Sequence, residues 1–143
     1  MGGGVQCERY AEGGERRLGG HAGEVRSLAW REGRVYSGSC DGTIRVWNRT
    51  TLEHERTLVV DSDCRRRFWA CSLAVWEGFL ISGDSVGGMV VWNAATGERE
   101  WELEGHVWSV NPLAVEGSLL LSGSDDRSVK VSLRCGRWDC KIE

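Results

Sequence analysis

Residues 35–47 read VYSGSCDGTIRVW, and two close variants of this stretch follow later in the chain. Residues 80–92 read LISGDSVGGMVVW, and residues 120–132 read LLSGSDDRSVKVS. Each has an apolar pair before Ser-Gly, a polar turn, and then a segment in which apolar residues alternate, the period of two that is typical of β-strands. Gly38, Gly83 and Gly123 recur at intervals of 45 and 40 residues, which indicates an internal structural repeat.

The repeat extends upstream of these stretches. Residues 27–30 (SLAW), 72–75 (SLAV) and 112–115 (PLAV) stand in register with one another, and the Gly-His pairs at 20–21 and 105–106 open the first and third copies. The chain has 20 glycines and a single proline, and no window of helical length keeps an apolar stripe free of glycine. We therefore predict an all-β chain.

The units resemble the WD-repeat family, whose unit runs from Gly-His to Trp-Asp and folds as one four-stranded antiparallel blade of a β-propeller. The resemblance implies a partial propeller of about three blades. In the first blade it places strands at 25–30, 34–39, 43–47 and 53–58. Because blades flank one another on both faces, inner strands should be apolar on both sides, as residues 79–81 (FLI) and 119–121 (LLL) are.

The register also predicts how the 143 residues are divided within a single incomplete propeller. Blade 1 is expected at 19–58, blade 2 at 59–103 and blade 3 at 104–143. Residues 5–8 lie 85 positions before residues 90–93, so residues 5–18 are expected to end a preceding blade. Since propellers close with four to eight blades, we expect a fragment or truncated product, or a chain whose ring needs further blades or a second chain.

The resemblance implies a hydrogen-bonded relay of His, Ser, Asp and Trp in each blade. The first blade has all four members, the second keeps two and the third keeps three; they are His21, Ser37, Asp41, Trp47, Ser82, Trp92, His106, Ser122 and Asp126. In blade 2, Val86 replaces the Asp and Arg66 stands near the His position; in blade 3, Ser132 replaces the Trp. Asn48 and Asn93 also replace the Asp of the Trp-Asp pair. Ser, His and Asp together occur in hydrolases, but within this motif we favour a structural role and predict no catalytic residue.

A partner site is expected on the rim where loops enter each inner strand and where the second and third strands are joined. The predicted binding residues are Glu24, Arg65, Arg66, Arg67, Phe68, Trp69, Trp108 and Asp125. Trp and Arg are enriched in binding hot spots, although the tryptophans could instead pack between blades. The three arginines are either a solvated loop or a docking point for an acidic or phosphorylated peptide.

Composition argues against several other classes of function. The net charge of −3 has no basic cluster of the kind that nucleic-acid binding needs, and the apolar runs are far too short to span a membrane. The six cysteines lack repeated C-x-x-C spacing and a secretory context, which favours free thiols in a soluble protein of the cytoplasm or nucleus. A zinc site of Cys64, Cys71, Cys135 and Cys140 is the alternative; we predict no metal and no cofactor.

The predicted function is that of a non-enzymatic scaffold or adaptor that binds a protein or peptide on the propeller rim. Two alternatives remain open. The chain could be the substrate-recognition propeller of a ubiquitin ligase complex, or a truncated, non-functional remnant of a longer WD-repeat protein.

Overall fold

The computed structural model describes residues 15–60, 69–103, 105–135 and 137–141, and every regular element in these ranges is a β-strand. Blade 1 contains β1 (Val25–Arg31), β2 (Arg34–Ser39), β3 (Thr43–Asn48) and β4 (His54–Val59). Blade 2 contains β5 (Ala70–Trp76), β6 (Phe79–Asp84), β7 (Met89–Asn93) and β8 (Arg99–Leu103). Blade 3 contains β9 (Val110–Glu116), β10 (Leu119–Ser124), β11 (Val129–Cys135) and β12 (Arg137–Lys141).

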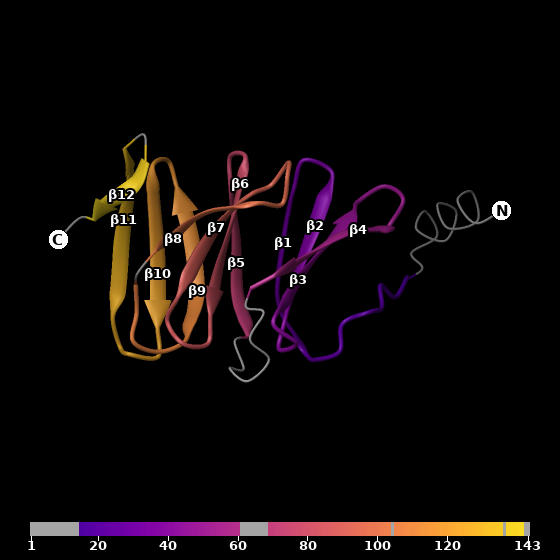
Figure 1. The fold of residues 1–143 in the computed structure, drawn as a ribbon, viewed down its shortest axis with the longest axis horizontal. Helices are drawn as coiled ribbons and strands as arrows, with labels where there is room; N and C mark the ends of the chain where they lie inside the picture. The colour runs from indigo at the N-terminus through magenta and orange to yellow at the C-terminus, as the bar shows by residue number, and fades with distance from the viewer. Residues whose placement is uncertain (1–14, 61–68, 104, 136, 142–143) are drawn as a thin grey trace.

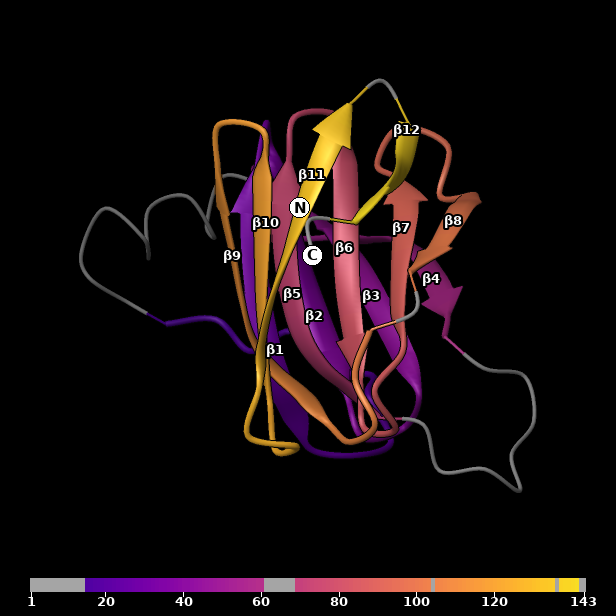
Figure 2. The same cartoon turned by 90° about the vertical axis from the view of Figure 1, so that its left-hand side faces the viewer.

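Each blade is an antiparallel sheet in which strands adjacent in the chain are adjacent in space. The three blades lie side by side in chain order (Figure 1), and a view along this row shows β9–β11, β5–β7 and β1–β3 stacked with the same strand order (Figure 2). The predicted fold class, three four-stranded propeller blades in an all-β chain, is confirmed. Of the segment expected to end a preceding blade, residues 5–14 lie outside the described ranges and residues 15–18 form no strand.

The pairing register makes the three blades directly comparable. Leu28 pairs with Ser37 in blade 1, Leu73 with Ser82 in blade 2, and Leu113 with Ser122 in blade 3. The first hairpin turns through Glu32 and Gly33, both with positive φ (50° and 80°), as a two-residue type I′ turn requires. This turn has the twist that matches its flanking strands, so it sets the register of β1 against β2.

The core lies between the blades. We call the side of a blade that is turned to the following blade its front face, and the opposite side its back face. One cluster joins the front face of blade 1 (Ala29, Tyr36, Ile44, Val46) to the back face of blade 2 (Leu73, Leu80, Val90, Trp92). A second cluster joins the front face of blade 2 (Trp76, Ile81, Val91) to the back face of blade 3 (Leu113, Val115, Leu120).

Burial therefore follows the stacking of the blades. Leu80 and Ile81 are adjacent in β6 and both fully buried, because blade 2 is covered on both faces. Leu120 is buried while Leu121 is only partly so, because the front face of blade 3 lies at one end of the row. No helix long and apolar enough to cross a membrane occurs in the described ranges.

Candidate functional site

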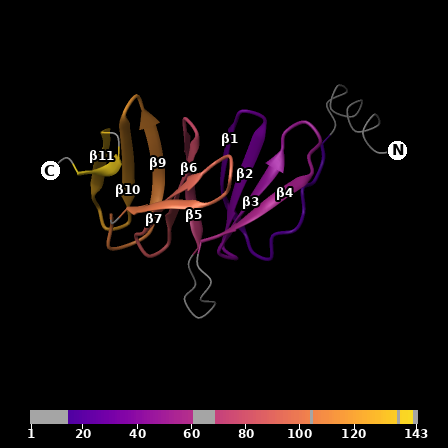
Figure 3. The ribbon, with the colours of Figure 1, turned by 45° about the horizontal axis from the view of Figure 1, so that its top comes forward.

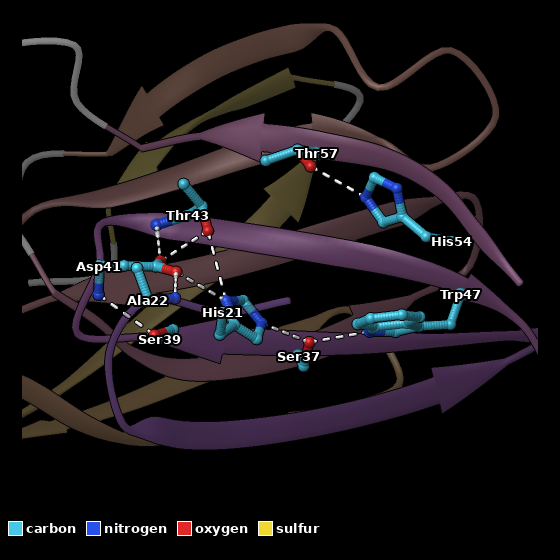
Figure 4. Close-up of polar contacts among 9 residues, drawn as sticks. All are labelled: His21, Ala22, Ser37, Ser39, Asp41, Thr43, Trp47, His54 and Thr57. Carbon is cyan, nitrogen blue, oxygen red and sulfur yellow. Dashed lines mark hydrogen bonds and ion pairs between the residues drawn. The ribbon is translucent and has the colours of Figure 1, made fainter. Parts of the chain in front are cut away.

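The first blade contains a chain of hydrogen bonds between four side chains that are distant in sequence (Figure 4). The Trp47 indole N–H donates to Ser37 Oγ over 2.9 Å, and Ser37 Oγ lies 2.7 Å from Nε2 of His21. Nδ1 of His21 lies 2.9 Å from Asp41 Oδ2. Because the Ser37 oxygen accepts from Trp47, its own proton is directed to Nε2, and Nδ1–H then donates to Asp41. The relay ties the segment before β1 to β2, β3 and the turn between them.

Asp41 is the charged end of this relay. Burial alone would raise its pKa, but hydrogen bonds from Thr43, His21 and the Ala22 amide outweigh burial and lower the pKa to about 2. The Thr43 hydroxyl donates to Oδ1 over 2.6 Å and the Thr43 amide over 2.9 Å. The carboxylate therefore stabilises the β2–β3 turn through several donors at once.

The same three residue types in hydrogen-bonded series also form the catalytic centre of many hydrolases. Here the Ser37 side chain is enclosed, since the residue is 5% exposed and its oxygen already accepts from the Trp47 indole. The equivalent Ser122 is 2% exposed. A hydroxyl in such surroundings is not accessible to a substrate, so the geometry supports a structural role for both.

Blade 3 contains the relay without its tryptophan. Nε2 of His106 lies 2.9 Å from Ser122 Oγ, and Nδ1 lies 3.0 Å from Asp126 Oδ2. A hydrogen bond from the Ser128 hydroxyl is the main reason that the pKa of Asp126 lies well below its usual range, although desolvation opposes it. By register Ser132 occupies the place of Trp47, so the Ser122 hydroxyl has no indole donor at that position.

Blade 2 is built differently at the same turn. The Trp92 indole N–H donates to Ser82 Oγ over 2.9 Å, as in blade 1. Val86 stands where the relay aspartate would be and is 50% exposed, while Arg66 lies outside the described residues. The carboxylate comes instead from Asp84, whose Oδ1 accepts from the amides of Val86 and Gly88 over 2.9 and 2.8 Å.

Sequence reasoning missed Asp84 because a serine stands at its position in the other blades. Ser39 and Ser124 hold the turn through a hydroxyl that accepts from the amide two residues later. The Asp84 carboxylate does this and also accepts from Gly88. Burial raises its pKa, and the hydrogen bonds from Val86 and Gly88 only partly offset this. The available signal was an Asp three residues before Gly87, a pattern that favours an Asx turn.

The replacement of Trp-Asp by Trp-Asn has a local explanation. Asn48 Oδ1 accepts from the amides of Thr50 and Thr51 over 2.8 and 2.9 Å, and Nδ2 donates to Glu55 over 3.1 Å. Asn93 makes the same set of contacts with Ala95, Thr96 and Glu100. An aspartate could accept from the two amides but could not donate to the glutamate.

The structure places part of the predicted rim together, at the end of the blades where the chain enters β1, β5 and β9 (lower edge of Figure 1). Trp108 is 57% exposed and the adjacent Val107 is 77% exposed. Asp125 is exposed beside them and accepts from Asn111 Nδ2 over 2.8 Å. The Trp108 carbonyl accepts from the Ser124 hydroxyl over 3.0 Å, which fixes the backbone below this indole.

Trp69 and Glu24 occupy the same end of blades 2 and 1. Trp69 is partly buried: its amide donates to Ser85 Oγ over 3.0 Å, and the Arg26 guanidinium lies 5.6 Å from the centre of its ring. Glu24 is exposed, with Oε2 3.7 Å from Arg26 Nη1. The rim tryptophans were expected either to be exposed or to pack between blades. Trp108 is exposed, whereas Trp69 is partly packed. The predicted residues Arg65, Arg66, Arg67 and Phe68 lie outside the described residues.

Three rim residues were absent from the prediction: Arg26, Asn111 and Val107. The register contained a signal for the first two, because Arg26 stands two positions after the predicted Glu24 and Asn111 is its counterpart in blade 3. Val107 follows the relay residue His106, and its exposure follows from the tertiary position of the loop.

A cavity of about 690 Å³ lies beside the rim, against the β6–β7 turn. Its lining includes apolar groups of Val60, Val86 and Val107 together with the charged residues Asp84 and Arg99. The Arg99 guanidinium lies 5.1 Å from the centre of the Trp92 ring and donates to the Val60 carbonyl. The cavity thus combines apolar surface with two fixed charges of opposite sign.

The cysteines whose side chains are described, Cys40 and Cys71, are free thiols. Burial raises the pKa of the Cys71 thiol. Of the four cysteines in the alternative zinc site, only Cys71 has a described side chain. Within the described part of the chain, no group of three or more His, Cys, Asp or Glu side chains is placed to hold a metal ion.

Stacked four-stranded blades, joined by apolar clusters and with side-chain hydrogen bonds holding the turns within each blade, define a repeat protein of the β-propeller class. A family model described as "WD domain, G-beta repeat" matches residues 15–48 and 97–131. The crystal structure of the computationally designed Ika4 protein is 30% identical, with a TM-score of 0.70, and the match covers 82% of this chain and 70% of that one. The chain belongs to the WD-repeat family.

Other solved structures show the same fold over part of a longer chain. The RRP9 WD40 repeats match with 24% identity and a TM-score of 0.74, covering 82% of this chain and 38% of that one. The computationally designed Ika8 protein matches with 30% identity and a TM-score of 0.68, covering 80% of this chain and 34% of that one. This chain therefore spans about a third of the length of both. Comparison with curated proteins gave no match.

Proposed function

We propose that this chain is a non-enzymatic interaction module that binds a protein or peptide on the rim formed by Glu24, Trp69, Trp108 and Asp125. WD-repeat proteins are in general protein-binding scaffolds, which is the function that membership of the family supports. The observation that carries the proposal is the exposure of Trp108 and Val107 next to the charged Asp125. An exposed indole beside a hydrogen-bonded carboxylate combines the apolar anchor and the polar neighbour that binding hot spots use.

The adjoining cavity extends this surface. Val107 borders both the rim and the cavity, so a partner whose apolar side chain covers Trp108 could place the next side chain against Val86 and Val60. Arg99 and Asp84 would then contact the polar or charged groups of that side chain. This arrangement favours an extended peptide segment over a flat protein surface.

The finer features of the predicted partner rest on the sequence. An acidic or phosphorylated segment would match the guanidinium groups of Arg65–Arg67, and the cytoplasm or nucleus would keep Cys40 and Cys71 reduced. A role in a ubiquitin ligase and the status of a remnant stay predictions.

The test is selection of peptides from a random display library on the 143-residue chain, followed by calorimetry with the best binders. Trp108→Ala should weaken binding at least tenfold, about 1.4 kcal/mol, because it removes the exposed anchor. Glu98→Ala is the control, since Glu98 is exposed in the β7–β8 connection at the opposite end of blade 2. Equal affinity for the Trp108→Ala chain, or an equal loss with Glu98→Ala, would exclude the rim as the binding site.

A further inference from the structure

The back face of blade 1 and the front face of blade 3 lie at opposite ends of the row of blades (Figures 1 and 3). Leu28 and Trp30 on the first face are 62% and 69% exposed. Val129 on the second face is 70% exposed. Leu28 and Trp30 stand two residues apart in β1 and so lie on the same face, and an exposed apolar patch of this kind marks an interaction surface.

The register shows what kind of surface each face is. Leu28 is equivalent to Leu73, which is 9% exposed in the cluster between blades 1 and 2. Val129 is equivalent to Ile44 and Met89, which are 0% and 2% exposed. Each open face is therefore an uncovered copy of a surface that is buried elsewhere in the same molecule, and both continue the established interfaces between blades.

Front and back faces are unlike, which determines how they can pair. Inside the molecule a front face packs only on a back face: the small Ala29 and the strand residues Ile44 and Val46 meet the larger Leu73 and Trp92. We propose that the front face of blade 3 binds the back face of blade 1 of a second copy of this chain. Two copies joined in this way at both ends present six blades, within the range of four to eight in which propellers close.

Charge supports this pairing. In the cleft between blades 1 and 2, Arg31 of the front face lies near Ala94 of the following blade. The equivalents in the new interface are Glu116 on blade 3 and Arg49 at the edge of blade 1. Opposite charges thus face each other where the front face of one copy meets the back face of the other.

One hydrogen bond of the internal interfaces is missing. The Ser27 hydroxyl of blade 1 donates to the Ala70 carbonyl of blade 2 over 3.4 Å, and the Ser72 hydroxyl of blade 2 donates to the Val110 carbonyl of blade 3 over 2.9 Å. The equivalent residue in blade 3 is Pro112, which has no hydroxyl to donate to Val25 of the second copy. We therefore expect the contact between copies to be weaker than the contacts between blades and to dissociate on dilution.

The experiment is sedimentation analysis of the 143-residue chain over a range of concentrations, with variants at both faces. The wild type should form a dimer, and Leu28→Asp and Val129→Asp should each shift the dimerisation constant at least a hundredfold toward monomer. Pro112→Ser should strengthen the dimer severalfold by restoring the missing donor. Circular dichroism checks that each variant keeps its β-sheet content.

Mixing the two aspartate variants separates this arrangement from other dimers. The Leu28→Asp chain keeps an intact front face and the Val129→Asp chain keeps an intact back face, so the mixture should form a heterodimer through one interface although neither forms a homodimer. A monomeric wild type would overturn the proposal, and so would a dimer that only Leu28→Asp disrupts and that mixing fails to restore, because that dimer pairs two back faces.

Discussion

The β2–β3 turn of blade 1 and the β6–β7 turn of blade 2 have the same backbone but different side-chain chemistry. Gly42 and Gly87 stand at equivalent positions with φ of 81° and 96°, and each turn is held by a carboxylate. In blade 1 that carboxylate belongs to Asp41, and in blade 2 it comes from Asp84, two positions earlier. The repeat thus specifies the turn, while the residue that satisfies its amides can move.

The two carboxylates differ in their response to pH. Hydrogen bonds from Thr43 and His21, against the effect of burial, lower the pKa of Asp41, so its charged form stabilises the fold. Burial raises the pKa of Asp84, so its charged form costs stability. The turn of blade 2 therefore keeps its hydrogen bonds although the relay is incomplete, but the pKa of its carboxyl group is shifted in the opposite direction from that of Asp41.

The largest expected difference between the blades comes from their buried serines. Ser37→Ala removes the partner of both Trp47 and His21, while Ser82→Ala removes only the partner of Trp92. At about 1 to 3 kcal/mol for each buried group left unpaired, Ser37→Ala should lower the free energy of unfolding about twice as much as Ser82→Ala. Urea denaturation measures this, with the exposed Ser118→Ala as control. An equal loss would mean that His21 contributes nothing through Ser37.

The next effect is the pH dependence of the two turns. Asp41 has a folded pKa of about 2 against an unfolded value of 3.8, so its stabilisation, about 2 kcal/mol, is present above pH 4 and lost as the pH falls toward 2. The stability difference between wild type and Asp41→Asn should shrink over this range.

Asp84 should behave in the opposite way, because its pKa is raised. The charged form is disfavoured in the folded state, so the stabilisation from Asp84 is lost as the pH rises through its folded pKa. As the pH falls, the stability of the wild type should therefore increase relative to that of Asp84→Asn. Denaturation of both pairs at several pH values measures the slopes, and slopes of the same sign would contradict the comparison.

A third test converts the turn of blade 2 into that of blade 1. Asp84→Ser removes the acceptor of the Gly88 amide and should cost about 1 to 2 kcal/mol. Adding Val86→Asp should recover most of this, because Val86 is 50% exposed and the new carboxylate would stand where Asp41 caps its turn. Thermal denaturation of the single and double variants is sufficient, and a double variant no more stable than Asp84→Ser would show that the turns are not interchangeable.

The smallest expected effect concerns the two Trp-Asn pairs. Asn48→Asp and Asn93→Asp each remove the donor to a glutamate and place two carboxylates side by side, which should cost about 0.5 to 1 kcal/mol. Asn48→Asp should cost less, because Arg34 already donates to Glu55 over 2.9 Å and partly neutralises it. Raising the salt concentration should reduce both losses, and a loss unaffected by salt would point to the hydrogen bond alone.

Much of the fold could be predicted because each blade is a local antiparallel unit. Strand bounds in blade 1 differ from the prediction by at most one residue, since the Gly33 turn and the alternation around Ile44 and Val46 act within a few positions of each other. The candidate rim was predicted in part, because the register alone places Trp69 and Trp108 in equivalent loops, one position apart.

The sequence by itself determined the all-β class, the three repeats and the residues that could form relays, since these depend on periodicity and spacing. Only the tertiary structure decided that Asp84 replaces the missing relay carboxylate, that Trp69 packs under Arg26 while Trp108 is exposed, and that Leu28 is uncovered where Leu73 is buried. The physical reason is that burial and hydrogen bonding depend on which blade lies against each face. Equivalent positions in a repeat do not specify which residues they contact in the folded chain.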